Sequence, residues 1–283
     1  METTLAFSLI PDTISSPVPF LLLGGLSAAL MGAAKAGFAG SVGILSVPMM
    51  IYACGGDAPL AVGILLPLLI VCDYVSLPFW WRKWSWPTVR GMLGGMALGT
   101  AVGTAVFWLI LRVGESGEGA LDQPRALLKL LIGVIALGFV ALQTIRARSG
   151  RLAAYRPRPW HGLLAGSGAG LTSTLAHSAG PITTVYLLPQ EMPKQRFVAT
   201  TVLYYWIGNQ AKVAPYLWLG ALNAETAAAA AALAPAIIAG ALLGIFLHHR
   251  VNQKVFTAIV YVLLAVMGAH MTVTSVLKLI GVN

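Results

Sequence analysis

The stretch Gly32-Ala-Ala-Lys-Ala-Gly-Phe-Ala-Gly-Ser-Val-Gly43 interrupts the first long apolar run of the chain, and Gly170-Leu-Thr-Ser-Thr-Leu-Ala-His-Ser-Ala-Gly180 interrupts a later run in the same way. Both breaks are rich in glycine and other small residues, and both carry polar side chains. Unwound backbone at membrane depth persists only where it is buried in protein or lines a cavity. Two such breaks at corresponding places in two halves of a chain indicate the substrate site of a transporter.

The composition is that of a membrane protein. Of the 283 residues, 58% are hydrophobic and only 10% are charged, whereas soluble domains average about 45–50% and about 25%. Long apolar segments recur along the whole chain, which predicts an all-α polytopic integral membrane protein with about 8–10 transmembrane segments. The net charge of +9 arises mainly from basic residues in short loops, so we interpret it as a topology signal and expect a lipid bilayer, not nucleic acid, as the partner. The two cysteines, Cys54 and Cys72, fit neither a disulfide framework nor a metal-ligand pattern, and we expect no metal and no cofactor.

The second half of the sequence repeats the plan of the first. At one constant offset Ser41 aligns with Ser178, Gly43 with Gly180, Pro78 with Pro215 and Trp81 with Trp218; after a short insertion Gly99 aligns with Gly240 and Gly103 with Gly244. We therefore predict an N-terminal extracytoplasmic tail at 1–17, a first transmembrane repeat at 18–146, a basic cytoplasmic linker at 147–159 and a second repeat at 160–283. One predicted span covers 91–112, where glycines recur every four residues as in closely packed membrane helices.

Charge predicts the orientation. The loops 81–90, 146–160, 190–196 and 248–254 contain twelve of the eighteen basic residues. Seven of the nine acidic residues fall on the opposite side. Since basic loops stay in the cytoplasm, both termini are predicted to be extracytoplasmic, in the cell membrane. The two broken, re-entrant hairpins then enter from opposite faces, which defines two inverted-topology repeats.

Ionisable side chains within apolar segments are functional candidates, because each costs at least ~2.5–3.5 kcal/mol to insert. Asp73 and Lys212 lie within predicted spans, and Lys35 and His177 lie at the two breaks. Helix N-termini near the breaks add positive dipole ends that attract anions. The predicted substrate-binding residues supply charge, hydrogen-bond donors or close backbone approach, and they are Lys35, Gly40, Ser41, Gly43, Thr172, Ser173, His177, Ser178, Gly180, Asn209, Gln210 and Lys212. Donors outnumber buried acids, so we expect a small inorganic or organic anion as the substrate.

Structural roles compete with each of these assignments. Lysine stems reach interfaces readily, so Lys35 is also a candidate for an interfacial residue. Lys212 is also a candidate for a structural ion pair with Asp73. His177 is either a proton-relay group or a neutral core histidine bonded to a carbonyl, and the hydroxyls are also able to satisfy helix backbone. An intramembrane enzyme is disfavoured, because the adjacent Ser178 and His177 are badly placed to act as nucleophile and base; we predict no catalytic residue.

Several motifs, in order and with matching spacing, resemble the TauE/SafE sulfite exporter family. In the first half they are Lys35-Ala-Gly-Phe-Ala-Gly-Ser-Val-Gly43, Val47-Pro48 and Leu65-Leu-Pro-Leu-Leu-Ile-Val-Cys-Asp73. In the second half they are Leu171-Thr-Ser-Thr-Leu-Ala-His-Ser-Ala-Gly-Pro181, Tyr186-Leu-Leu-Pro189 and Asn209-Gln-Ala-Lys-Val-Ala-Pro-Tyr216. The resemblance covers about residues 20–280, and it implies a multi-pass permease that exports sulfite, sulfoacetate or related organosulfur anions.

The leading hypothesis is therefore a secondary transporter that binds a small sulfur-containing anion at the bilayer midplane between the two broken hairpins. Asp73 and His177 are the candidates for a proton-coupling role. The alternatives are an anion channel and a transporter for small carboxylates. A homodimer is among the expected assemblies.

Overall fold

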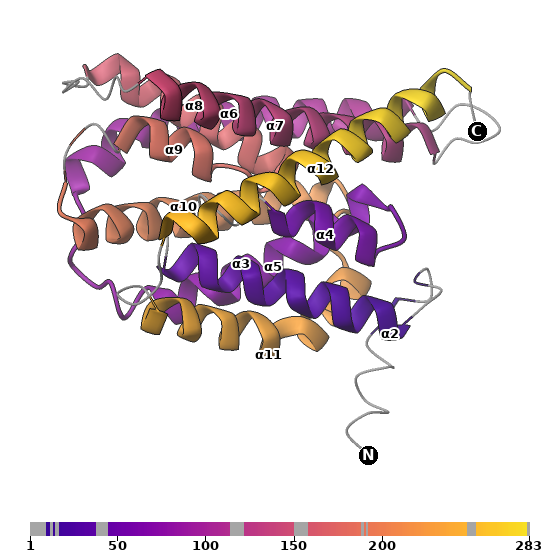
Figure 1. Ribbon diagram of the computed structural model, residues 1–283, viewed down its shortest axis with the longest axis horizontal. Coiled ribbons are helices and arrows are strands. Elements are labelled where there is room, and N and C mark those ends of the chain that lie inside the picture. The colour runs from indigo at the N-terminus through magenta and orange to yellow at the C-terminus, as the bar shows by residue number, and fades with distance from the viewer. Residues whose placement is uncertain are drawn as a thin grey trace.

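The computed structural model describes residues 10–11, 14, 17–37, 45–113, 122–149, 158–187, 190, 192–247 and 253–281. Within these residues the regular structure is helical throughout, without strands (Figure 1). The first half contains α2 (Pro17–Pro19), a π-helical turn η1 (Phe20–Gly24), α3 (Gly25–Gly37), α4 (Ser46–Ala53), α5 (Ala58–Ser76), α6 (Trp86–Val113) and α7 (Asp122–Ser149). The second half contains α8 (Pro159–Ala176), α9 (Gly180–Leu187), α10 (Lys194–Trp218), α11 (Ala224–Leu247) and α12 (Gln253–Leu279).

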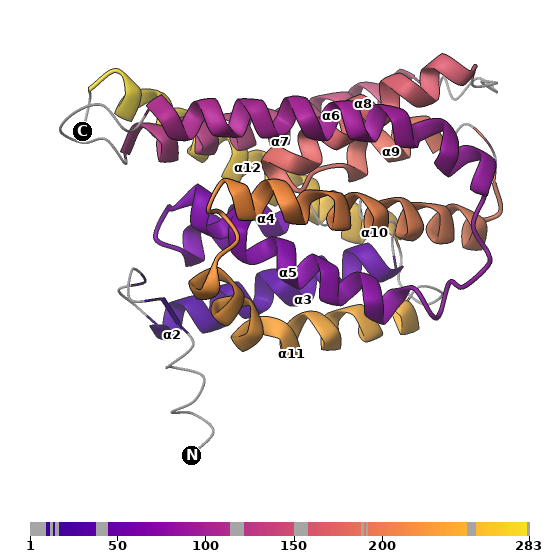
Figure 2. The ribbon, with the colours of Figure 1, turned by 180° about the vertical axis from the view of Figure 1, so that it is seen from behind.

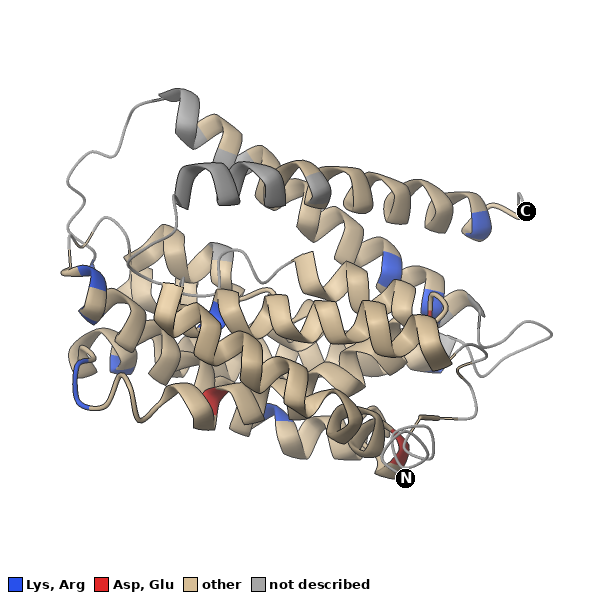
Figure 3. Cartoon of the chain, turned by 60° about the horizontal axis from the view of Figure 1, so that its bottom comes forward, with Lys and Arg blue, Asp and Glu red and all other residues tan. Residues whose placement is uncertain are grey.

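Four stretches of helix in the described part of the chain are long and apolar enough to cross a membrane, and they cover Pro17–Gly37, Ala58–Ser76, Trp86–Arg112 and Ala224–Leu247. Charged residues are concentrated toward the two ends of the bundle, with few between them (Figure 3). The prediction of an all-α polytopic membrane protein is confirmed. The span predicted over 91–112 begins earlier, at Trp86, because a proline such as Pro87 is well tolerated in the first helical turn.

The helices after the two breaks are short. Both α4 and α9 have eight residues, about 12 Å at 1.5 Å per residue, whereas the hydrocarbon core is about 30 Å thick. Neither helix crosses the membrane alone, as expected for broken hairpins. The tip of the first hairpin, with Gly40, Ser41 and Gly43, lies outside the described residues.

The two repeats exchange their first helices. The first helix of each repeat packs along the fourth helix of the other: α3 lies beside α11, and α8 lies beside α6 (Figures 1 and 2). Gly240 and Gly244 of α11 face the backbone of Ala29 and Ala33 in α3. Likewise, Gly99 and Gly103 of α6 face α8. The glycines that align between the two halves of the sequence thus occupy equivalent helix contacts, because only glycine allows this backbone approach.

Equivalent helices of the two repeats also meet each other, and they run antiparallel. In the α5–α10 pair, Asp73 near the end of α5 contacts Asn209, while Gly63 near its start faces the carbonyl of Ala221, just beyond the end of α10. In the α7–α12 pair, Gly133 faces Thr272, and the rings of Phe139 and Tyr261 are 5.5 Å apart between centroids. A pseudo-two-fold axis that relates antiparallel helices is perpendicular to them, so the repeats have inverted topology.

These glycine contacts predict that two glycine-to-alanine substitutions on α6 have different effects on the free energy of unfolding. A Cβ on Gly99 would lie 2.8 Å from the backbone nitrogen of Leu171, whereas a Cβ on Gly94 would meet only the flexible end of Leu163 at 3.6 Å. Gly99→Ala should lower the free energy of unfolding by about 1–3 kcal/mol through overpacking. Gly94→Ala should leave it unchanged or raise it by up to about 1 kcal/mol, since alanine favours helix. Thermal unfolding in detergent measures both, and equal effects would contradict the packing described here.

Candidate functional site

The break between α8 and α9 presents His177 to the centre of the molecule. The His177 N–H donates to the carbonyl of Ser173 at 3.0 Å and closes α8. Its backbone is left-handed, with φ 47° and ψ 27°, a conformation that is unfavourable for residues other than glycine. The side chain offsets this cost through a hydrogen bond that reaches α5, where its Nε2 lies 2.9 Å from the carbonyl oxygen of Val62.

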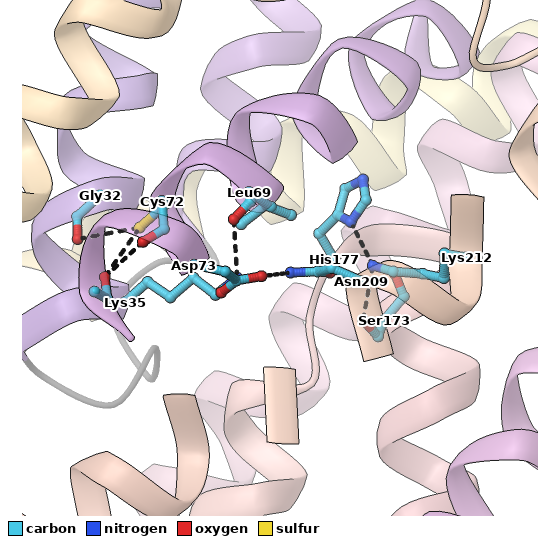
Figure 4. A network of polar contacts seen from close by, with 10 residues as sticks. Gly32, Lys35, Leu69, Cys72, Asp73, Ser173, His177, Asn209 and Lys212 are labelled. Atoms are coloured by element: carbon cyan, nitrogen blue, oxygen red, sulfur yellow. Dashed lines mark hydrogen bonds and ion pairs between the residues drawn. The ribbon is translucent and has the colours of Figure 1, made fainter. Parts of the chain in front are cut away.

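Lys212 of α10 is 1% exposed, and its ammonium group binds this same break. Nζ lies 3.0 Å from Ser173 Oγ, 3.3 Å from the Ser173 carbonyl and 3.0 Å from His177 Nδ1 (Figure 4). A carbonyl oxygen only accepts and an ammonium group only donates, so with Lys212 protonated Nε2 carries the imidazole hydrogen and Nδ1 accepts from Lys212. This hydrogen bonding assigns His177 as the neutral imidazole. The three hydrogens of the Lys212 ammonium are then directed at three neutral acceptors.

Asp73 of α5 connects the two repeats. Its Oδ1 lies 2.5 Å from Nζ of Lys35, in the last turn of α3. Its Oδ2 accepts a hydrogen bond of 2.7 Å from the side-chain amide of Asn209. Lys35 is 5% exposed and Asp73 is 1% exposed, so the ion pair is removed from solvent and depends on these bonds to repay desolvation. Asp73 therefore pairs with Lys35 and not with Lys212, and Lys35 does not extend to an interface.

The charges of this cluster do not cancel. Lys35 and Asp73 neutralise each other, His177 is neutral, and Lys212 has no carboxylate within salt-bridge distance among the described residues. Figure 4 shows the two lysines on either side of the Asp73–Asn209 bond. When Lys212 is protonated, the cluster carries one excess positive charge in a buried environment, where charge–charge interactions are strong. This arrangement suits an anion.

A small cavity adjoins the cluster. Its volume is about 30 Å³, and its lining residues are Met31, Lys35, Leu69, Ser173, His177, Ala179, Gly180, Tyr205 and Asn209. Space for one water molecule requires at least about 10–15 Å³ on this measure, so the cavity holds about two water-sized groups. Five of the predicted substrate-binding residues line it, namely Lys35, Ser173, His177, Gly180 and Asn209.

The remaining predicted residues that the structure describes lie elsewhere or bind backbone groups. Thr172 Oγ1 donates to the carbonyls of Gly168 and Ser178, and Ser178 Oγ donates to the carbonyl of Ala176. These hydroxyls stabilise the break itself. Gln210 does not line the cavity, because it points about 100° away from Asn209 around α10. Lys212 is behind the lining and reaches the cavity through Ser173 and His177.

Tyr205 is a cavity residue that the sequence interpretation missed. Its hydroxyl lies 2.6 Å from Thr183 Oγ1, which joins α10 to α9, and Lys35 Nζ lies 5.7 Å from the centre of its ring. Residues four and seven positions apart share a helix face, so the spacing of Tyr205, Asn209 and Lys212 places all three on one side of α10. This helical spacing was the feature of the sequence that could have placed Tyr205 at the site.

Comparison with known families gives a match over most of the chain. The family model described as Sulfite exporter TauE/SafE matches residues 25–271. The matched range contains every residue of the central cluster. No curated protein and no solved structure gives a significant match.

The buried ion pair predicts strong coupling between two substitutions. Lys35→Met and Asp73→Asn should each lower the free energy of unfolding by about 3–5 kcal/mol, because each leaves a buried charge without its partner. The double variant should lose clearly less than the sum of the two, since it retains no unpaired charge at the pair. Thermal or denaturant unfolding in detergent measures these values, with the exposed Lys83→Met as a control expected within about 0.5 kcal/mol of wild type. Additive losses would show that the two side chains do not interact.

Proposed function

Because the chain belongs to the sulfite exporter TauE/SafE family of membrane transporters, we propose that it binds a small sulfur-containing anion at the central cluster and exports it across the cell membrane. The observation that carries this proposal is the uncompensated ammonium of Lys212, 1% exposed, at the break between α8 and α9. A bound monoanion would bring the charge of the cluster to zero. The family match supports a membrane transporter of the sulfite exporter type. The positive charge of the cluster supports a negatively charged substrate.

The donors around the cavity match an oxyanion. Ser173 Oγ is able to rotate its hydrogen toward an anion, and Lys212 lies directly behind it. The first turn of α9 begins at Gly180, where the free N–H groups and the helix dipole favour negative charge. These groups would replace the hydration shell of the ion. Lys35 is already neutralised by Asp73, so its role in binding is secondary to that of Lys212.

The cavity favours a compact substrate. At about 30 Å³ it accommodates about two water-sized groups. Sulfite, with one sulfur and three oxygens, needs less expansion of this space than sulfoacetate, which carries a second anionic group on a carbon chain. We therefore propose sulfite as the preferred substrate and place longer organosulfonates second.

Export requires the two repeats to move against each other around the bound anion. The hinge position in this proposal is the break between α8 and α9, where a short helix meets a longer one. Proton uptake by Asp73 would separate it from Lys35, free a second ammonium and raise the charge of the cluster from +1 to +2. Anion affinity would thus depend on the protonation of Asp73. His177 serves in this scheme as a neutral acceptor that orients Lys212.

Substitution of Lys212 tests the anion site. Lys212→Met should weaken sulfite binding by about tenfold to about a hundredfold, the effect of losing a charge-assisted hydrogen bond. Binding is measured by isothermal titration with purified protein, and a melting curve without ligand verifies that the variant is folded. Lys83→Met, at an exposed loop lysine, is the matched control and should bind as wild type. If Lys212→Met does not fold, Ser173→Ala tests the same site, with an expected loss of about tenfold. Unchanged affinity in a folded variant would place the site elsewhere.

Flux assays test the mode of transport. In proteoliposomes the export of sulfite should saturate and show counterflow, which a fixed open channel does not produce. The flux should respond to a pH gradient in the wild type and lose this response in Asp73→Asn, because asparagine cannot take up a proton. Wild-type flux that ignores the pH gradient would eliminate proton coupling while leaving the anion site intact.

A further inference from the structure

A second cavity, of about 260 Å³, lies at the end of the bundle where α10 turns into α11. Its described lining is mostly apolar and comes mainly from α5, α6, α7 and this turn; it includes Leu60, Phe107, Leu111, Leu219 and the Asp57–Arg125 ion pair. Gly220 and Asn223 also line it and are exposed, so the cavity opens at this end. Loop charge predicts that this end is extracytoplasmic, and the space is called the outer cavity below.

The outer cavity approaches the candidate site along α5. Leu60 lines it, and the carbonyl of Val62, two residues further on, lies 2.9 Å from His177 Nε2. Two helical residues correspond to about 3 Å along the axis. Gly63 agrees with this position, since a Cβ there would lie 2.1 Å from the carbonyl oxygen of Ala221, another lining residue. Because His177 itself lines the central cavity, the two cavities come close to each other at His177.

Three contacting aromatic rings lie between the two cavities. The centroid of the His177 ring is 5.9 Å from that of Tyr216, and the centroid of Tyr216 is 5.9 Å from that of Phe107. His177 lines the central cavity and Phe107 lines the outer one, whereas Tyr216 lines neither and is 0% exposed. These three rings, from the break, α10 and α6, form a continuous contact that we name the aromatic barrier.

Hydrogen bonds hold the middle ring in place. The hydroxyl of Tyr216 donates to the carbonyl of Thr174 at 2.7 Å, one of the carbonyls that the end of a helix leaves without an intrahelical partner. The backbone carbonyl of Tyr216 accepts from the N–H of Leu222 at 3.0 Å, which ties the residue to the α10–α11 turn. Since Thr174 and His177 both adjoin the break between α8 and α9, a movement of this break would separate Tyr216 from both.

The equivalent residue of the first repeat has a different environment. The offset that aligns Pro78 with Pro215 also aligns Phe79 with Tyr216. Phe79 is 49% exposed, whereas Tyr216 is 0% exposed. An aromatic ring is therefore buried at one end of the bundle and exposed at the equivalent position of the other end. Alternating access by inverted repeats requires a difference of this kind, because the path to the site is closed at one end at a time.

We propose that the aromatic barrier of His177, Tyr216 and Phe107 closes the exit path of the anion, and that the outer cavity is the vestibule through which the anion leaves. The direction of transport and the identity of the anion rest on the proposed function, whereas the barrier rests on the ring contacts. Tyr216 and Phe107 control how fast the anion leaves and not how tightly it binds, because neither lines the central cavity. Movement of the break opens the path by withdrawing Thr174 and His177 from Tyr216.

Tyr216→Phe tests the barrier through transport. The substitution keeps the ring and removes the hydrogen bond to Thr174, so the closed state loses one hydrogen bond. Sulfite efflux from proteoliposomes should rise about two- to tenfold, while the Kd for sulfite from isothermal titration should stay within about twofold of wild type. The matched control is Tyr204→Phe on the same helix, whose hydroxyl binds the carbonyl of Gly166 at 3.4 Å and which lines neither cavity. Control efflux should equal that of wild type, and an equal result for Tyr216→Phe would contradict a gating role.

Thiol labelling tests the barrier without transport. After replacement of both native cysteines, which are free and buried, Ala179→Cys places a thiol in the central cavity and Asn223→Cys places one in the outer cavity. A negatively charged, membrane-impermeant methanethiosulfonate added outside intact cells should modify position 223 at least about tenfold faster than position 179, because position 179 reacts only when the barrier opens. Adding Tyr216→Phe or Phe107→Leu should raise the rate at 179 several-fold and leave the rate at 223 unchanged.

Two results would overturn the barrier: equal labelling rates at positions 179 and 223 behind the native rings, or rates that neither barrier substitution changes. Phe139→Leu is the matched control for Phe107→Leu, since Phe139 also contacts a tyrosine ring, that of Tyr261 at 5.5 Å, but lines neither cavity. It should change neither rate, and melting curves verify that each variant is folded. A failure of the proposed function is distinguishable, because the labelling pattern does not require sulfite, and a failure of the barrier would leave the effect of Lys212→Met on sulfite binding in place.

Discussion

The hydrogen bond from Asn209 to Asp73 is the contact on which the arrangement of the centre depends. It joins α5 and α10, the equivalent helices of the two repeats. In an apolar environment a carboxylate without partners is very costly, so Asp73 also requires Lys35 from α3. One buried carboxylate thereby fixes three helices relative to one another. Because Asp73 pairs with Lys35, it does not neutralise Lys212, which contacts Ser173 of α8.

Glycine contacts make this centre possible. The exchanged pairs α3–α11 and α6–α8 approach so closely that several of their glycines face the backbone of the partner helix. The two close helix pairs lie on opposite sides of the molecule, and the short helices α4 and α9 lie between them (Figure 1). The break at His177 is therefore surrounded by protein, which is the condition for non-helical backbone at membrane depth. The same small residues therefore allow both the close packing of the helices and the buried break that forms the candidate site.

The sequence predicted the helical membrane fold, the repeats and their inversion, because hydropathy, glycine spacing and loop charge are local signals that survive folding. Polar groups are rare in apolar segments, and the structure brings six that the sequence pointed to into one cluster, namely Lys35, Asp73, Ser173, His177, Asn209 and Lys212; their roles in binding and coupling stay predictions. The pairing among them was not predictable. Whether Asp73 contacts Lys35 or Lys212 depends on how each helix is rotated about its own axis. The composition of the segments and the positions of single residues do not determine that rotation. Tyr205 was missed for a related reason: an aromatic residue in an apolar helix is ordinary until its face is known.

The hydrogen bonds of Lys212 bear on how an anion could leave as well as bind. Three neutral acceptors already surround its ammonium group, so an arriving anion gains the charge interaction but displaces or shares existing bonds. The net gain is smaller than it would be for a lysine without partners, because protein hydrogen bonds contribute only the difference between two bonded states. Transport requires a site that is favourable enough to enter and weak enough to leave. A lysine held by neutral groups, and not by a carboxylate, satisfies both conditions: it keeps its full charge for the substrate while retaining partners when the substrate departs.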